Sequence, residues 1–175
     1  MPELSDVLQD AIKLEQDGER YYEMAAAKAA NPLAKNTFAA LAEQERAHAD
    51  LLRAYCDAVD EGGTCPTPAA IDERDYSLGA TARRIFEQAV ADLAGGAVPA
   101  EDLHELYETA MQMERMSIEL YRQQGDAATD PHAAEFFAYL VEQERGHLKL
   151  LADGQQYLED PDSWYFEEEQ WGVTG

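Results

Sequence analysis

Residues 38–52, FAALAEQERAHADLL, decide the fold, because they recur 99 positions later as FAYLVEQERGHLKLL at residues 137–151. Eight of the first eleven positions are identical, and both copies contain Glu-Gln-Glu-Arg-x-His. Glu45 and His48 of the first copy stand three residues apart, which places both side chains on one face of a helix. This spacing is typical of a pair of metal ligands.

The same offset holds upstream, where Glu15 and Tyr22 correspond to Glu114 and Tyr121. Each half carries one glutamate thirty residues before its Glu-x-x-His pair, with no insertion or deletion between them. A repeat of this kind indicates two copies of one supersecondary unit, here a helix pair. The candidate metal ligands are Glu15, Glu45, His48, Glu114, Glu144 and His147.

Apolar residues recur at helical spacing in both halves, and a proline interrupts each stripe, at Pro32 and Pro131. Because the residue before a proline is biased away from the helical conformation, each half is predicted to be two helices joined by a short turn. The expected helices cover about residues 5–29, 32–59 and 99–128, and a fourth that follows Pro131 and frays or bends near Gly154.

The second and third helices are joined by a long, turn-rich connection, in which residues 78–93 can form a shorter helix. A crossover of about 40 Å joins parallel neighbours in a bundle of this size, and roughly forty residues suffice for it. We therefore predict an all-α four-helix bundle of ferritin-like topology over residues 1–160. Residues 161–175, acidic and aromatic, are expected to form a tail that docks on the bundle or on a second subunit.

Composition limits the partners and the compartment. A chain of 175 residues with 46% hydrophobic residues fits one domain, and 36 acidic against 13 basic residues give a net charge of −23. This charge opposes binding to nucleic acid and to anionic membranes. The sequence shows neither a membrane span nor a secretory signal, so we expect a cytoplasmic protein. Cys56 and Cys65 are too few for a disulfide framework; a bridge between them is sterically conceivable, but we expect reduced thiols.

Four glutamates that meet at a bundle axis would repel one another unless cations lie among them. Two divalent ions balance four carboxylates, and carboxylate with imidazole, without thiolate, indicates iron or manganese rather than structural zinc. We assign each ion one glutamate and one histidine, with two further glutamates as bridges. The pairs are Glu15 with His48 and Glu114 with His147, and the bridges are Glu45 and Glu144.

Other polar residues near these positions have simpler interpretations. Tyr22 and Tyr121 lie two helical turns beyond their glutamates and either hydrogen-bond ligand carboxylates or are ordinary core residues. The two other histidines and the two glutamates that precede the ligand pairs are expected on the surface. They are His104, His132, Glu43 and Glu142.

The pattern A-x-x-x-E-x-x-x-x-x-x-Y followed by L-x-E-Q-E-R-x-H occurs twice and resembles the rubrerythrins of the ferritin-like superfamily, over roughly residues 8–158. The resemblance implies a non-haem centre of two iron ions per chain, held by the six candidate ligands. Manganese is the alternative to iron. It also implies reduction of hydrogen peroxide under oxidative stress, with electrons from a rubredoxin-type iron site. We expect a homodimer.

Two features depart from typical rubrerythrins. Their extra glutamate, three residues after the ligand of the third helix, is replaced by Ser117, which corresponds to Gly18 in the first half. The centre is therefore more symmetric and closer to a bacterioferritin ferroxidase site. The paired C-x-x-C motifs of a rubredoxin domain are also missing, so electrons are expected from a separate donor such as a rubredoxin-like protein.

Three functions follow from this sequence. The first is a di-iron oxidoreductase that reduces hydrogen peroxide or dioxygen. The second is a ferroxidase or iron-handling protein of the ferritin type, whose substrate is Fe²⁺ itself. The third is a metal-binding protein with a structural site, whose tail engages a partner.

Overall fold

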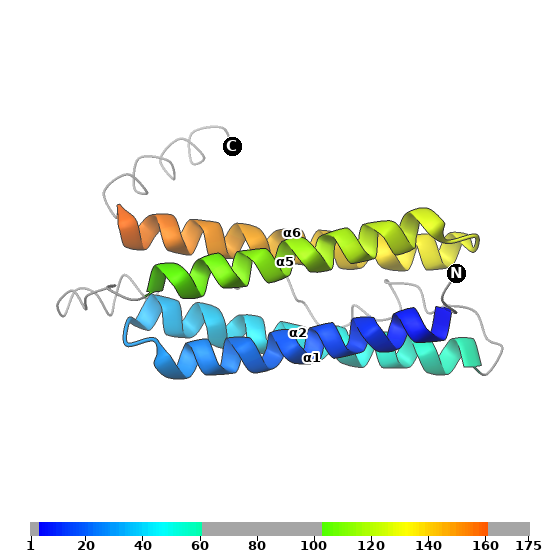
Figure 1. The fold of residues 1–175 in the computed structure, drawn as a ribbon, viewed down its shortest axis with the longest axis horizontal. Coiled ribbons are helices and arrows are strands. Elements are labelled where there is room, and N and C mark those ends of the chain that lie inside the picture. The colour runs from blue at the N-terminus through cyan, green and yellow to red at the C-terminus, as the bar shows by residue number, and fades with distance from the viewer. Residues whose placement is uncertain (1–3, 61–102, 161–175) are drawn as a thin grey trace, which may run out of the picture.

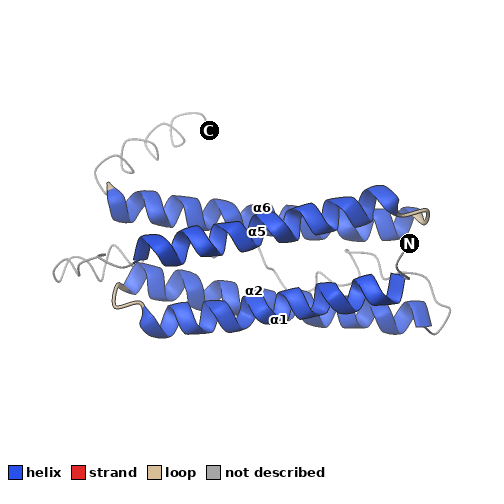
Figure 2. Cartoon of the chain, in the orientation of Figure 1, coloured by secondary structure: helices blue, strands red, loops and turns tan. Residues whose placement is uncertain are grey.

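The computed structural model describes residues 4–60 and 103–160, which form four long helices and no strand (Figures 1 and 2). These helices are α1 (Leu4–Lys28), α2 (Pro32–Asp60), α5 (Leu103–Ala127) and α6 (Pro131–Glu159). The prediction of an all-α four-helix bundle is confirmed. The helix expected over residues 78–93, the tail over 161–175 and Cys65 lie outside the described residues.

The two halves of the repeat form two antiparallel helix pairs stacked on each other (Figure 1). Helix α1 packs mainly against α2, and α5 packs mainly against α6, while α1 also contacts α5 and α2 also contacts α6. Helices α2 and α5 run in the same direction in Figure 1, as the predicted ferritin-like topology requires. Within the described ranges, no helix combines the length and the apolarity that a membrane crossing needs.

Both helix pairs turn at the predicted prolines. Asn31 accepts a hydrogen bond at Oδ1 from the backbone N–H of Ala34, at 3.2 Å, and so caps α2. Asp130 accepts one at Oδ1 from the backbone N–H of His132, at 3.0 Å, and so caps α6. Both helices then begin with proline, which lacks the N–H that a first helical turn leaves without a partner.

The prediction that the fourth helix frays near Gly154 is wrong, because α6 continues to Glu159. Gly154 is buried, and a Cβ atom added to it would lie 3.1 Å from the hydroxyl oxygen of Tyr107. The glycine therefore provides room for an aromatic ring against an unbroken helix, instead of ending that helix.

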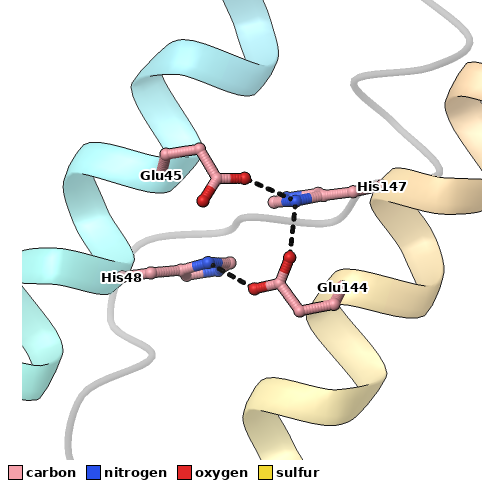
Figure 3. A group of neighbouring side chains, drawn as sticks. All are labelled: Glu45, His48, Glu144 and His147. Carbon is pink, nitrogen blue, oxygen red and sulfur yellow. Dashed lines mark ion pairs between the residues drawn. The ribbon is translucent and has the colours of Figure 1, made fainter. Parts of the chain in front are cut away.

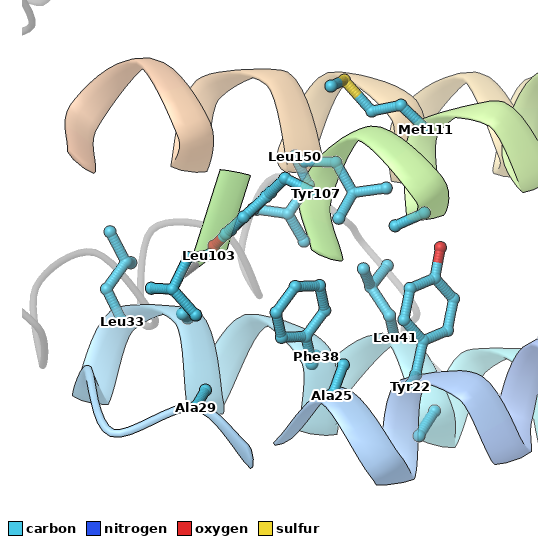
Figure 4. Close-up of a cluster of buried hydrophobic side chains, with 14 of the residues drawn as sticks. Tyr22, Ala25, Ala29, Leu33, Phe38, Leu41, Leu103, Tyr107, Met111 and Leu150 are labelled. Atoms are coloured by element: carbon cyan, nitrogen blue, oxygen red, sulfur yellow. The ribbon is translucent and has the colours of Figure 1, made fainter. Parts of the chain in front are cut away.

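The core consists of two apolar clusters, and each receives side chains from all four helices. The first cluster, around Tyr22, Phe38, Tyr107 and Leu150, is drawn in Figure 4. The second cluster includes Leu8, Leu52, Tyr121 and Phe137. On every helix the candidate ligands lie between residues of one cluster and residues of the other. The polar residues thus form a layer with packed apolar side chains on both sides.

Replacing Gly154 with alanine is expected to destabilise the protein by about 1–2 kcal/mol. Pressing a Cβ against the buried ring of Tyr107 costs roughly 1–3 kcal/mol, and the higher helix propensity of alanine offsets up to about 1 kcal/mol. Gly125→Ala is the matched control, since its Cβ would make an ordinary 3.5 Å contact with Phe137. Urea unfolding measures both variants, and equal stability of the two would contradict the packing argument.

Candidate metal centre

The six predicted ligands come together in the middle of the bundle. As whole residues, none of the six is more than 6% exposed. Figure 3 shows Glu45 and His48 of α2 facing Glu144 and His147 of α6. One ligand atom from each of these four residues lies within 4.8 Å of the others. Repetition of the motif has therefore brought two Glu-x-x-His pairs, distant in sequence, into one cluster.

The Nδ1 atoms of the two histidines face the carboxylates. His48 Nδ1 lies 2.9 Å from Glu144 Oε1 and 3.3 Å from Glu15 Oε2. The imidazole rings of His48 and His147 are nearly parallel, with centroids 5.2 Å apart and an interplanar angle of 17°. This arrangement follows the approximate two-fold relation between the two halves.

His147 has carboxylates of three helices around it. Its Nδ1 lies 3.0 Å from Glu45 Oε1, 3.2 Å from Glu144 Oε2 and 3.5 Å from Glu114 Oε2. Glu144 therefore presents one oxygen to each histidine, as a bridging ligand would. Glu114 lies on the His147 side of the cluster, as the assignment from sequence requires. Which residue binds which ion stays a prediction.

The donor atoms of this cluster lack the hydrogen bonds that buried polar atoms normally make. Six buried atoms in the cluster have no hydrogen-bond partner: Glu15 Oε2, Glu45 Oε1, His48 Nδ1, Glu144 Oε1, Glu144 Oε2 and His147 Nδ1. Buried polar atoms without partners are rare in proteins, and here they converge on one another. Carboxylate oxygens and imidazole nitrogens are also the donors that iron and manganese prefer. These residues therefore fit a pair of such ions.

Burial and mutual repulsion change the acidity of the carboxyl groups. Burial, together with the nearby carboxylates of Glu15 and Glu144, raises the pKa of Glu45 well above its usual value. Burial also raises the pKa of Glu114 to about 8, although His147 opposes this change. The pKa of Glu144 is lowered well below its usual value, because attraction to the two histidines outweighs burial. In the metal-free protein, Glu45 and Glu114 therefore favour their protonated forms, which reduces repulsion within the cluster.

The histidines change in the opposite sense to ordinary buried histidines. Burial alone would lower the pKa of His48, but the carboxylates of Glu144 and Glu15 outweigh burial and raise that pKa to about 9. Glu114 and Glu144 likewise raise the pKa of His147 well above its usual value. The carboxylates thus create a negative electrostatic field around these nitrogens, and this field attracts a cation, either a proton or a metal ion that replaces it.

The two tyrosines bind glutamates across the bundle. The Tyr22 hydroxyl of α1 donates a hydrogen bond to Glu114 Oε1 of α5, and the Tyr121 hydroxyl of α5 donates one to Glu15 Oε1 of α1. Burial and these carboxylates raise the pKa of both tyrosines well above the usual value, so each remains a protonated donor. The sequence left two interpretations open for these tyrosines. The structure agrees with the first, because both hydroxyl groups donate hydrogen bonds to candidate ligand carboxylates.

Tyr121→Phe is expected to weaken metal binding about 10–100-fold, because Glu15 would lose the group that orients its carboxylate. Tyr21→Phe is the control, since the Tyr21 hydroxyl donates to the backbone oxygen of Leu106, at 2.8 Å. Competition with a chelator measures the affinity of each purified variant. An equal loss in both variants would show that the hydroxyl of Tyr121 has no specific effect.

Sequence reasoning missed Gln44 beside the centre, and it named Gly18 only as the counterpart of Ser117. Gln44 is 5% exposed, and its Oε1 lies 2.8 Å from Nε2 of His147. Gly18 lies against Glu45, such that an added Cβ would stand 3.3 Å from Glu45 Oε2. The signal for Gln44 was its presence in both copies of the motif, whereas nothing in the sequence distinguished Gly18 as a neighbour of Glu45.

The four surface predictions are confirmed. These residues are all exposed: His104, His132, Glu43 and Glu142. His104 lies 3.1 Å from Glu159 at the bundle surface, far along α5 from the candidate ligand Glu114.

Comparison with known proteins supports the resemblance seen in the motif. A family model described as rubrerythrin matches residues 6–154. Curated protein sequences and solved structures give no match. Because the family match covers most of the chain and includes all six buried carboxylate and imidazole residues, the protein belongs to the rubrerythrin family.

Proposed function

We propose that the protein is a non-haem di-iron oxidoreductase that reduces hydrogen peroxide or dioxygen. The observation that carries this proposal is the convergence of six buried carboxylate and imidazole atoms that make no hydrogen bond and lie within ion-pair distance of one another. Membership of the rubrerythrin family supports a di-iron centre at this cluster, which lies within the matched residues 6–154. The reaction itself is inferred from the donor set and from the resemblance.

In this proposal each half of the centre has its own pair of ligands. Glu15 and His48 would hold one ion, Glu114 and His147 would hold the other, and Glu45 and Glu144 would lie between them. A pair of iron ions bound there would supply the two electrons that reduce one peroxide to water. Four carboxylates would balance the charge of two divalent ions.

The surrounding residues would control water and protons at this centre. The apolar clusters on both sides exclude bulk water, which strengthens electrostatic interactions in the layer between them. Tyr22 and Tyr121 keep one proton each on a hydroxyl oxygen next to a glutamate. Peroxide reduction consumes protons as well as electrons, and these two hydroxyl groups are the nearest hydroxyl donors that the structure shows on Glu114 and Glu15.

Rapid mixing of the ferrous protein with each oxidant tests the proposal. Oxidation by hydrogen peroxide is expected to be much faster than oxidation by dioxygen, followed by absorption in a stopped-flow instrument. Comparable or slower oxidation by peroxide would contradict a peroxidase. A metal that survives both oxidants unchanged would contradict the oxidoreductase and favour a structural site.

A ferroxidase is the second candidate, and the environment of the bridging glutamates favours it. Gly18 and Ser117 are both buried at equivalent positions of the two halves, and neither supplies a seventh carboxylate. The candidate centre therefore lacks the further glutamate of typical rubrerythrins and is closer in composition to a bacterioferritin ferroxidase site. Continued oxidation as Fe²⁺ is added beyond two ions per chain would support the ferroxidase, whereas oxidation that stops there would exclude turnover of iron.

We also propose that a separate protein, such as one with a rubredoxin-like iron site, returns electrons to the centre. The described residues contain one cysteine, Cys56, and so no cysteine cluster that could hold such an iron site beside the bundle. Steady peroxide consumption upon addition of reduced rubredoxin would support this donor. No rate increase over a chemical reductant would contradict it.

A further inference from the structure

The two halves of the centre differ in how they hold their histidines. Nε2 of His147 lies 2.8 Å from Oε1 of Gln44, which reaches across from α2 to α6. The equivalent residue in the second half, Gln143, is half-buried, and in the described part of the chain it makes no hydrogen bond to His48. The repeated sequence is therefore symmetric at this position, but the folded chain is not.

The hydrogen bond from His147 has a defined direction. The amide oxygen of Gln44 only accepts hydrogen bonds, so Nε2 of His147 carries the proton. With Nε2 protonated, a neutral His147 presents the lone pair of Nδ1 to Glu45 and Glu144, at 3.0 and 3.2 Å. Groups that fix a histidine in this way also fix its ring orientation and increase its affinity for metal.

Burial and charge favour the same half of the centre. The side chain of His147 is fully buried, whereas that of His48 is 7% exposed. Three carboxylates lie within 3.5 Å of Nδ1 of His147, and two lie within 3.3 Å of Nδ1 of His48. A larger number of carboxyl oxygens that can bind a cation and a fixed ring both increase the affinity of this half for a cation.

We propose that Gln44 is a positioning residue that makes the half formed by Glu114 and His147 the tighter of two metal subsites, so that it fills first. This inference rests on the proposed function, because it requires two ions at the centre. Loss of a hydrogen bond to a ligating histidine weakens metal binding about 10–100-fold. The two subsites of the unmodified protein therefore differ in affinity by a factor of this order.

Anaerobic titration with Co²⁺, followed by visible absorption and by calorimetry, tests the inference. The unmodified protein is expected to take up Co²⁺ in two steps, about 10–100-fold apart in affinity. Gln44→Met has a side chain of similar length without the amide oxygen, and it is expected to weaken the tight step until the two steps merge. Gln44→Glu keeps an acceptor and should keep the tight step.

Gln143→Met is the matched control, because it changes the equivalent residue of the other half and should leave both steps unchanged. Equal weakening of both steps in Gln44→Met would show a structural role and overturn the inference. The same binding curve in Gln44→Met and Gln143→Met would also overturn it, while two bound ions would leave the proposed function standing. Uptake of fewer than two ions by the unmodified protein would instead overturn the proposed function.

A second pair of variants avoids any dependence on the folding of Gln44→Met. Glu114→Gln is expected to remove the tight step, and Glu15→Gln is expected to remove the weak step, because each glutamate belongs to one half of the centre. The absorption spectrum of the first Co²⁺ bound should therefore persist in Glu15→Gln. The reverse assignment would overturn the inference.

Discussion

Replacing Glu144 with glutamine is expected to lower the bound metal from two ions per chain to one or none. Glu144 places one oxygen 2.9 Å from Nδ1 of His48 and the other 3.2 Å from Nδ1 of His147. An amide offers one neutral oxygen in place of two charged ones, so both halves of the centre lose a ligand. Loss of an orienting partner alone costs up to about 100-fold in affinity, and loss of a shared ligand should exceed this.

Metal analysis of the freshly purified variant, grown with added iron, measures this effect. Glu142→Gln is the control, since Glu142 lies on the same helix but is exposed and paired with Arg145. This control is expected to keep its full metal content. Two ions per chain in Glu144→Gln would show that the carboxylate of Glu144 does not join the halves of the centre.

The second large effect concerns pH. The metal-free protein is expected to lose stability as the pH rises from about 6 to about 9. The pKa of His48 is about 9 in the folded protein against 6.5 in an unfolded chain, so its stabilisation is complete below pH 6.5 and is lost as the pH rises through about 9. The pKa of His147 is raised in the same direction, which adds to this loss.

The carboxyl groups with raised pKa act in the same sense. Glu114, with a pKa of about 8, keeps its proton in the folded protein where an unfolded chain would have lost it above pH 4.5. Stability from this group is therefore complete below pH 4.5 and declines toward pH 8. Glu144, whose pKa is lowered, loses its contribution only as the pH falls below 4.5. Together, these groups are expected to lower the free energy of unfolding of the metal-free protein by a few kcal/mol between pH 6 and pH 9. This corresponds to a decrease of roughly 10 °C in Tm.

Bound metal is expected to reverse this trend. A cation replaces the protons at the centre, and its ligands must be deprotonated, so stabilisation by metal increases with pH. Thermal unfolding at pH 6, 7.5 and 9, with and without the redox-inert ion Zn²⁺, measures both effects. His48→Gln should flatten the curve of the metal-free protein, and His104→Gln, on the surface, should not. A metal-free protein that is equally stable at pH 6 and pH 9 would contradict the electrostatic argument.

Much of the fold and most of the centre could be predicted because they depend on local spacing. A repeat with a fixed offset, two prolines at equivalent positions and glutamates within apolar stripes are all visible along the chain. Helical periodicity then determines which face each side chain occupies. Glu15, Glu45 and His48 consequently lie where the pattern placed them, and so do their counterparts.

Other features depend on how the helices are rotated against each other, which spacing alone does not determine. Sequence spacing placed Tyr22 on the correct face but did not show that its partner is Glu114 on another helix. The bond between Gln44 and His147 depends on the distance between α2 and α6. The role of Gly154 depends on the ring of Tyr107, which comes from a helix 47 positions earlier in the chain.

The crossed bonds from Tyr22 to Glu114 and from Tyr121 to Glu15 mean that neither helix pair contains a complete centre. Each pair supplies half of the candidate ligands, and its tyrosine donates a hydrogen bond to a glutamate of the other pair. A single pair would have to dimerise about a two-fold axis to obtain the same environment. By joining both pairs in one polypeptide, the duplication makes assembly of the centre a first-order event, so its formation does not depend on protein concentration.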